Sequence, residues 1–340
     1  MPDLLPAGHP PVATPKIGVL LLNLGTPDAT DYWSVRRYLK EFLSDPRVIE
    51  TPKWLWWPIL NLVILSFRPQ KSGANYARIW DKRTNESPLL VITRDQATSL
   101  GQRLAGDNVV VDYAMRYGNP STASRLEALQ KAGCQKILLV PLYPQYSATT
   151  TATANDKAFD ALAQMRWQPA VRTAPAYFDD PFYVETLANS IRDGVAALDF
   201  EPDLVITSYH GMPQEYLEKG DPYHCQCLKT TRLVREKLGW PKDKLMVTFQ
   251  SRFGPTKWLE PYTDETLKSL PGKGIKKVAI LAPAFSADCI ETLEEIAITG
   301  EEEFMHAGGE RYAYIPCLNA SPAGMDMIEN MVRRELKGWL

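Results

Sequence analysis

The sequence predicts an α/β protein made of two similar, doubly wound (Rossmann-like) parallel-sheet domains with a cleft between them. Two observations predict this fold. Short apolar segments of strand length alternate with segments of helix length, and one series of motifs occurs twice along the 340 residues. A chain of this length also suits about two domains.

Strand-length and helix-length segments alternate along the chain. Six nearly continuous apolar segments are expected to be strands, at residues 18–23, 109–114, 137–142, 204–209, 245–249 and 277–282. Longer segments of mixed polarity lie between them and are expected to be helices, such as residues 121–132, 185–198 and 228–238. This alternation predicts parallel sheets that helices cover on both faces. Ligands of such sheets bind beyond the carboxyl ends of the strands, where the strand order reverses.

Three motifs of the first half recur in the same order in the second half. IGVLLLNLGTP (17–27) resembles DLVITSYHGMP (203–213), VVVDYAMRYGNP (109–120) resembles LMVTFQSRFGPT (245–256), and KILLVPLYPQYSATTTA (136–152) resembles KVAILAPAFSADCIETL (277–293). The expected organisation is a disordered tail at 1–15, an N-terminal half at 16–175, a C-terminal half at 176–320 and a packing helix at 321–340.

The first half is longer than the second. Gly25 and Lys136 are 111 positions apart, whereas the corresponding Gly211 and Lys277 are 66 apart, a difference of 45 residues. The extra residues fall between Gly25 and Arg116 and include the apolar segment WLWWPILNLVILSF at 54–67. This segment is therefore expected to be an insertion into one half and not part of the common scaffold.

The apolar segment 54–67 allows two interpretations. As a helix it would span ~21 Å, less than the ~30 Å of a bilayer core, so it is not expected to cross a membrane. One interpretation is a buried core helix. The favoured one is an element on a membrane surface, with its tryptophans at the interface and the flanking Lys53, Arg68 and Lys71 reaching lipid headgroups.

The composition is that of an ordinary globular protein and excludes several classes. The net charge is −2, and no basic stripe or arm indicates nucleic-acid binding. Five cysteines, an odd number in a chain of this length, favour a reducing compartment over a disulfide framework. The first residues lack the basic and apolar regions of a signal peptide.

His210 is the first candidate for chemistry. It ends an apolar strand directly before a Gly-x-Pro turn, where the cleft is expected. The nearby Cys225 and Cys227 do not have the spacing of a zinc site, and positions two apart on a helix do not face together. A core histidine without a function remains the alternative.

A row of carboxylates is the second candidate. The segment FSADCIETLEEIAITGEEEF (285–304) repeats acidic residues at roughly helical spacing: Asp288, Glu291, Glu295 and Glu302. A solvated acidic helix face is the plain interpretation. This helix follows a buried strand, however, so its first turn is expected at the cleft beside His210. Imidazole and carboxylate together suit a divalent metal such as Fe(II).

Over about residues 16–320 the chain resembles the ferrochelatases, which insert iron into a porphyrin at the end of haem synthesis. The resemblance rests on motifs in the expected order: LNLGTP, YAMRYGNP, LVPLYPQYS, SYHGMP with GDPY, FQSRFGPTKWLEPYTDE and DCIETL. It implies two chelatase-type halves with a porphyrin cleft between them. It also implies that residues 47–72 form an apolar lip at the entrance of the cleft.

The resemblance assigns residues position by position. His210 corresponds to the active-site histidine and Glu291 to the glutamate opposite it, and both are metal-site residues of the family. Leu24 falls where the family places a side chain on the other porphyrin face. The remaining substrate-binding residues that the resemblance implies are Arg68, Tyr76, Ser87, Arg116, Tyr117 and Trp258.

The chain departs from parts of the family pattern. Some members hold a [2Fe–2S] cluster on a cysteine-rich C-terminal extension, but here no cysteine follows Cys317, so no cluster and no tightly bound cofactor are expected. Cys289 stands where many relatives have a second histidine, and Thr299 replaces a carboxylate. Any iron path along Glu291 and Glu295 is shorter here.

The implied function is insertion of Fe(II), as substrate, into protoporphyrin IX. The expected location is cytoplasmic, with peripheral attachment to the inner membrane through residues 54–67. The alternatives are a chelatase for another metal or tetrapyrrole, such as coproporphyrin, and a non-catalytic haem carrier on the membrane surface. A carrier has no need of a carboxylate opposite His210.

Overall fold

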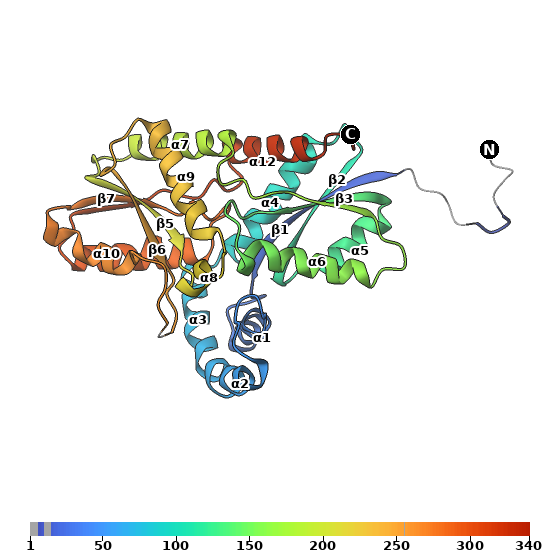
Figure 1. Ribbon diagram of the computed structural model, residues 1–340, viewed down its shortest axis with the longest axis horizontal. Coiled ribbons are helices and arrows are strands. Elements are labelled where there is room, and N and C mark those ends of the chain that lie inside the picture. The colour runs from blue at the N-terminus through green and yellow to red at the C-terminus, as the bar shows by residue number, and fades with distance from the viewer. Residues whose placement is uncertain (1–5, 10–14, 255) are drawn as a thin grey trace.

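Two parallel four-stranded sheets lie side by side in the protein (Figure 1). The structure is a computed structural model that describes residues 6–9, 15–254 and 256–340. The strand orders are β2-β1-β3-β4 and β6-β5-β7-β8, so equivalent strands of the two halves take equivalent places. The order in which strands are added to the sheet reverses between β1 and β3 in the first half and between β5 and β7 in the second. The tail expected at 1–15 lies mostly outside the described residues.

The six expected strands are all present, and each sheet has one more. The strands are β1 (Lys16–Thr26), β2 (Val109–Gly118), β3 (Cys134–Pro141), β4 (Ala170–Thr173), β5 (Leu204–His210), β6 (Leu245–Gln250), β7 (Lys277–Leu281) and β8 (Arg311–Tyr314). β4 and β8 escaped the sequence prediction because they are edge strands of four residues with mixed polarity, AVRT and RYAY.

Helices cover both faces of the sheets. They are α1 (Tyr32–Leu43), α2 (Lys53–Pro58), α3 (Leu65–Ile79), α4 (Pro88–Arg103), α5 (Thr122–Lys131), α6 (Thr153–Ala163), α7 (Pro181–Ala196), α8 (Gln214–Glu218), α9 (Tyr223–Leu238), α10 (Thr263–Ser269), α11 (Glu301–His306) and α12 (Pro322–Glu335). A short 3-10 turn, η4 (Pro271–Lys273), precedes β7. Three segments are wound as π-helix: η2 (Ile59–Ile64), η3 (Ala148–Ala152) and η5 (Glu291–Gly300).

The length difference between the halves has a structural counterpart. Between β5 and β6 the chain forms α8 and α9, whereas between β1 and β2 it forms α1, α2, η2, α3 and α4. Of these, α1, α2 and α3 project from the pair of sheets, whereas α4 packs against β1 and β2 (Figure 1). The apolar segment 54–67 runs through α2, η2 and the start of α3, with Pro58 inside the first helix.

The two halves share one hydrophobic core. A single cluster of buried side chains includes Val19 of β1, Val205 of β5 and Ala279 of β7, together with Ile328 of α12. α12 contacts α4 of the first half and α7 of the second (Figure 1). The C-terminal segment therefore contributes to the packing of both sheets.

Equivalent glycines lie at or just after the carboxyl end of the first strand of each half. Gly25 has a φ of +113°, and a Cβ there would lie 1.8 Å from the Tyr117 carbonyl oxygen. At the equivalent Gly211, a Cβ would lie 2.7 Å from the Gln250 carbonyl oxygen. Only glycine allows the backbone this close approach to the neighbouring strand. The side chains just before these glycines are thereby held at the rim of each sheet.

Each half also has a π-helical segment after its third strand. η3 follows β3, and η5 follows β7. π-helical winding is rare and is found frequently at functional sites. In the repeat, Ala148 corresponds to Cys289, two positions before η5 begins.

Candidate functional site

A cavity of about 900 Å³ opens at the carboxyl ends of the central strands of both sheets. Its lining includes Leu24 near the end of β1, Leu142 after β3, His210 at the end of β5 and Phe285 after β7. Side chains from α1 and α3 of the inserted segment line another side. The cavity lies at the switch points of the two sheets, where doubly wound folds bind ligands, and its volume is in the upper range for ligand pockets.

His210, the last residue of β5, has one ring nitrogen occupied. Its Nδ1 lies 2.7 Å from the carbonyl oxygen of Gly211. Because a carbonyl oxygen can only accept, Nδ1 carries the proton in the neutral ring, and Nε2 keeps its lone pair. The local backbone therefore holds the imidazole in the form that accepts a proton or binds a metal at Nε2.

Glu291 opens the π-helix η5 and lines the same cavity. The amide of Gln250 donates to the Glu291 carbonyl oxygen at 2.8 Å. The other end of that amide accepts from the Ser208 hydroxyl at 2.7 Å. Gln250 is buried at the end of β6, so β6 connects the strand that carries His210 to the helix that carries Glu291.

Glu295 lies one turn further along η5 and also lines the cavity. Its carboxylate accepts from the Ser251 backbone N–H at 2.6 Å and from the Ser251 hydroxyl. Burial raises the pKa of Glu295, and the negative charge of Glu291 acts in the same direction. The bonds from Ser251 and the charge of His210 oppose this rise. His210, Glu291 and Glu295 thus interact electrostatically in one site.

The other carboxylates of the acidic segment have different surroundings. Asp288 is buried away from the cavity lining and accepts from the Tyr314 hydroxyl at 2.6 Å and from the Asn319 amide at 2.6 Å. Glu302 lies on the outside and pairs with Arg78. Of the four carboxylates in this row, Glu291 and Glu295 therefore line the cavity, whereas Asp288 precedes η5 and Glu302 lies in α11, where the winding has changed from π to α.

The structure brings together six of the nine residues that the sequence assigned to the site. Those lining the cavity are Leu24, Arg68, Tyr76, His210, Trp258 and Glu291. Burial raises the pKa of Tyr76. The indole N–H of Trp258 is buried and has no hydrogen-bond partner among the described residues.

Ser87 does not line the cavity, contrary to expectation. It is buried at the start of α4, where its hydroxyl accepts from the Leu90 N–H as the N-cap. A Ser-Pro pair before an apolar segment is a typical helix start. The family resemblance implied a substrate contact for Ser87, but its side chain caps the helix instead.

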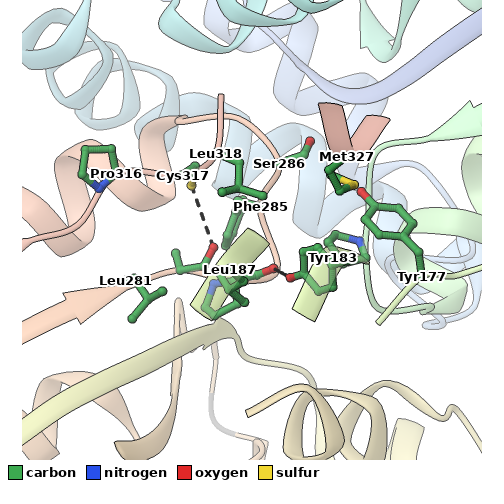
Figure 2. Close-up of a pocket in the computed structure, with 13 residues that line it drawn as sticks. Tyr177, Tyr183, Leu187, Leu281, Phe285, Ser286, Pro316, Cys317, Leu318 and Met327 are labelled. Carbon is green, nitrogen blue, oxygen red and sulfur yellow. Dashed lines mark hydrogen bonds between the residues drawn. The ribbon is translucent and has the colours of Figure 1, made fainter. Parts of the chain in front are cut away.

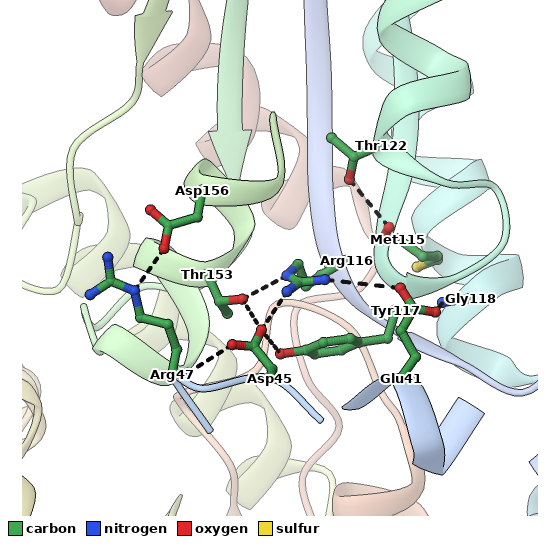
Figure 3. Close-up of polar contacts among 10 residues, drawn as sticks. All are labelled: Glu41, Asp45, Arg47, Met115, Arg116, Tyr117, Gly118, Thr122, Thr153 and Asp156. Atoms are coloured by element: carbon green, nitrogen blue, oxygen red, sulfur yellow. Dashed lines mark hydrogen bonds and ion pairs between the residues drawn. The ribbon is translucent and has the colours of Figure 1, made fainter. Parts of the chain in front are cut away.

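Arg116 and Tyr117 also lie outside the cavity lining, because Asp45 engages both (Figure 3). The buried Asp45 carboxylate accepts from Arg116, from the Thr153 hydroxyl and from the Tyr117 hydroxyl, the last at 2.8 Å. Burial alone would raise the pKa of Asp45, but these bonds and the Arg116 charge outweigh it and lower the pKa. The cluster fixes the segment after α1 to β2 and α6.

Arg252 and Phe253 line the cavity in place of their repeat partners Arg116 and Tyr117. β2 continues to Gly118, whereas β6 ends at Gln250, so only the second pair lies beyond its sheet. The guanidinium of Arg68 lies over the Phe253 ring at 4.7 Å, joining the inserted segment to the second half. The repeat aligned these residues and was the signal that could have identified them.

Tyr38, Lys71 and Asn75 also line the cavity and were not assigned from the sequence. They come from α1 and α3 of the inserted segment, which has no counterpart in the second half. The internal repeat therefore carried no signal for them.

A second cavity, of about 10 Å³, lies behind the loop after β7 (Figure 2). It has room for no more than about one water molecule. The Tyr183 hydroxyl donates to the Pro283 carbonyl oxygen at 2.7 Å at its edge (Figure 2). This cavity belongs to the packing that holds the loop leading to Glu291.

Among the described residues, no three His, Cys, Asp or Glu side chains are placed to hold a metal ion together. His210 and Glu291 therefore do not form a closed metal centre with a third such side chain.

The inserted segment exposes apolar side chains to solvent. Trp54, Trp57, Leu62 and Phe67 are 62–79% exposed. Leu60 and Leu65 face inward and are buried, so the interpretation as a core helix is wrong for most of the segment. In the part of the chain that is described, none of the helices has the length and hydropathy to cross a membrane.

Comparison with known proteins identifies the family. The sequence profile of the Ferrochelatase family matches residues 16–336. The chain belongs to the ferrochelatase family. It is 62% identical over 337 residues to the ferrochelatase of Allorhizobium ampelinum, covering 99% of this chain and 98% of that one. It is 60% identical over 333 residues to the ferrochelatase of Rhizobium meliloti, covering 98% of each. As a member of this family it is a metal-chelating lyase that inserts iron into a porphyrin in haem synthesis.

Solved structures agree with the ferrochelatase family in fold. SirB from Bacillus subtilis with Fe3+ matches with a TM-score of 0.57 at 13% identity, over 95% of this chain and 97% of that one. The cobalt complex of the sirohydrochlorin chelatase SirB matches with a TM-score of 0.53 at 11% identity, with the same coverage. The expected fold of two chelatase-type halves is confirmed.

Proposed function

We propose that the cavity binds protoporphyrin IX between Leu24 and His210, with Glu291 receiving Fe(II) on the His210 side. The observation that carries this proposal is that one cavity of about 900 Å³ holds all three residues. Leu24 and His210 are equivalent positions of the repeat, one in each half. An apolar side chain on one side and an imidazole on the other suit the two faces of a planar macrocycle.

His210 takes a pyrrole proton. Iron insertion releases two N–H protons from the macrocycle, and the free lone pair on Nε2 can accept one of them. The contact from Nδ1 to the Gly211 carbonyl supports this role, because it also stabilises the imidazolium that results. Glu291 holds the iron as it loses water and passes the second pyrrole proton to solvent, and Glu295 lies one turn further along η5. Carboxylate oxygens suit a hydrated divalent cation.

Cations of the inserted segment bind the substrate's carboxylates. Arg68 and Lys71 of α3 line the cavity, and neither forms an ion pair with a described residue. Arg68 is half-buried, and a guanidinium in such a place without a carboxylate partner favours an anionic ligand. Tyr76 and the unpartnered indole N–H of Trp258 add to the same binding surface. The mostly apolar remainder of the cavity favours protoporphyrin, which has two carboxylates, over coproporphyrin, which has four.

The reaction uses Fe(II) as substrate and no resident cofactor. In support of this part of the proposal, the five cysteines, at positions 134, 225, 227, 289 and 317, form no group that could hold a cluster among the described residues.

The apolar surface of residues 54–67 attaches the protein peripherally to the inner membrane from the cytoplasmic side. Trp56 of this segment lines the cavity, and Trp54, Trp57 and Phe67 of the same segment are exposed, so a poorly soluble porphyrin could pass from the membrane surface to the cavity. The flanking Lys53 and Lys71 suit anionic headgroups.

His210→Ala tests the assignment of the proton acceptor. Turnover with protoporphyrin and Fe(II) under anaerobic conditions is expected to fall by about two orders of magnitude or more, because the proton acceptor is lost. Porphyrin binding, measured by quenching of its fluorescence, is expected to change little. Turnover near that of the unchanged protein would refute the role of His210.

The same assay compares the alternatives for the substrate. The ratio kcat/KM is expected to be higher for protoporphyrin than for coproporphyrin. A reversed ratio would overturn the choice of substrate while leaving the chemistry of His210 intact. Binding of haem without any metal insertion would instead indicate a carrier.

A further inference from the structure

Glu294 lies on η5 between Glu291 and Glu295, and its carboxylate accepts hydrogen bonds from three side chains. Its side chain is 9% exposed. It accepts from Arg78 at 2.7 Å, from the Asn75 amide at 3.3 Å and from the Thr299 hydroxyl at 3.2 Å. Although Glu294 touches the cavity, these partners neutralise its charge and leave it poorly suited to bind iron.

The bond between Thr299 and Glu294 joins positions five apart. In an α-helix the facing neighbours are three and four apart, whereas a π-helix pairs residues five apart. This hydrogen bond therefore forms when η5 is wound as π. Two donors from outside the helix also bind its backbone, Gln250 at the Glu291 carbonyl and Tyr312 at the Ile296 carbonyl, the latter at 2.7 Å. Several contacts thus favour the uncommon winding.

The winding decides where the carboxylates of η5 point. Removing one residue from a turn rotates every later side chain by about 100° around the helix axis, because an α-helix has 3.6 residues per turn. If η5 relaxed to an α-helix, the side chains of Glu291 and Glu295 would therefore no longer both point into the cavity.

Arg78 anchors this arrangement from another part of the molecule. It belongs to α3 of the inserted segment and lies 216 positions before Glu294 in the chain. Its second amino group binds Glu302 at 2.7 Å, on the outer side of α11, where the Glu302 side chain is 57% exposed. One guanidinium therefore spans the junction between the π-helix and the α-helix that continues it.

We propose that Arg78 is a positioning residue for iron insertion. By holding Glu294 it keeps η5 in the π winding that directs Glu291 and Glu295 into the cavity. The inference rests on the role proposed for Glu291. Arg78 itself touches neither of these two carboxylates in any ion pair of the described residues.

Arg78→Gln tests the proposal through the separation of kcat from KM. The kcat for metal insertion is expected to fall by about tenfold to a hundredfold, the range for small misplacements of catalytic groups. The KM for porphyrin is expected to change less than about threefold. Arg78→Lys is expected to recover part of kcat, because an ammonium can still pair with Glu294 but lacks the fixed planar geometry of the guanidinium.

Two further variants make the result specific. Glu302→Gln removes only the exposed partner and is expected to keep kcat within about twofold, because exposed pairs contribute little. Thr299→Val removes the bond between positions five apart without leaving a buried charge, and its kcat is expected to fall while its Tm stays within a few degrees. If Arg78→Gln does not fold, the kcat of Thr299→Val tests the proposal in its place.

An unchanged kcat in both Arg78→Gln and Thr299→Val would overturn the proposal. Equal losses in kcat, porphyrin affinity and Tm would also overturn it, since they would indicate general destabilisation. Glu291→Gln is measured in parallel. If that variant keeps full activity, the role of Glu291 fails by itself, and a loss in Arg78→Gln would then need another cause.

Discussion

Asp45 has the largest set of polar partners in the N-terminal half. It joins Arg116, Tyr117 and Thr153 in a buried cluster (Figure 3). Its side chain is 3% exposed and that of Arg116 is 11% exposed. Removing one member of such a pair leaves an uncompensated charge in the interior, which is strongly destabilising.

Asp45→Asn is expected to lower the free energy of unfolding by about 3 kcal/mol at neutral pH. Because the pKa of Asp45 is lowered in the folded state, its contribution is complete above the unfolded value of about 3.9 and is lost as the pH falls through the folded value. Urea unfolding of both proteins between pH 3 and pH 7 measures this.

Asp156→Asn is the control for that series. Asp156 pairs with Arg47 on the surface, where its side chain is 46% exposed. Its loss is expected to cost less than about 1 kcal/mol. A similar cost for both variants, or a gap that widens in acid, would contradict the account of Asp45.

For the apolar segment 54–67, the sequence predicted the position of the insertion but not which side chains are buried. Its position between matched motifs predicted an addition to one half, and its apolar character suggested either burial or a surface role. Only the fold separates the inward Leu60 and Leu65 from the outward Trp54 and Phe67, because π winding in η2 shifts the faces away from the α period. Periodicity calculated for an α-helix could not assign these faces.

Replacing Trp54, Trp57 and Phe67 together by serine is expected to weaken binding to anionic liposomes at least about a hundredfold. Each inserted side chain contributes roughly 1.5–3 kcal/mol of transfer free energy. Co-sedimentation with vesicles measures the partition. Trp167→Ser, a half-exposed tryptophan between α6 and β4, is the matched control and is expected to leave binding unchanged. Equal binding by the triple variant would remove the membrane role.

At the scale of the whole molecule, much of the architecture followed from the chain's own repetition. The matched motifs located β1 with β5, β2 with β6 and β3 with β7, and placed His210 at the rim. The repeat also suggested that Arg116 has the place of Arg252. It does not, because the buried Asp45, just after α1, binds Arg116 and holds it away from the cavity. Contacts made by unrepeated residues were beyond prediction.

The shared core predicts that the halves unfold together. Ile328 of α12 is buried in the cluster that contains Val19 and Val205, and α12 touches both halves. Ile328→Ala is expected to cost about 2–5 kcal/mol through the cavity that it leaves. Amide hydrogen exchange is expected to accelerate in β1 and β5 alike. Loss of protection in β5 alone would show that the halves are independent.

The equivalence of Leu24 and His210 bears on how such a chain can arise. If the two halves descend from one duplicated half, the protein needs only one histidine at this position, because both halves line a single cavity that binds one porphyrin. The first half does not supply the histidine. It can therefore have Leu24 at the matching position and 45 additional residues without loss of the proton acceptor. Ancestry would then explain why the apolar lip grew on the half that lacks the histidine.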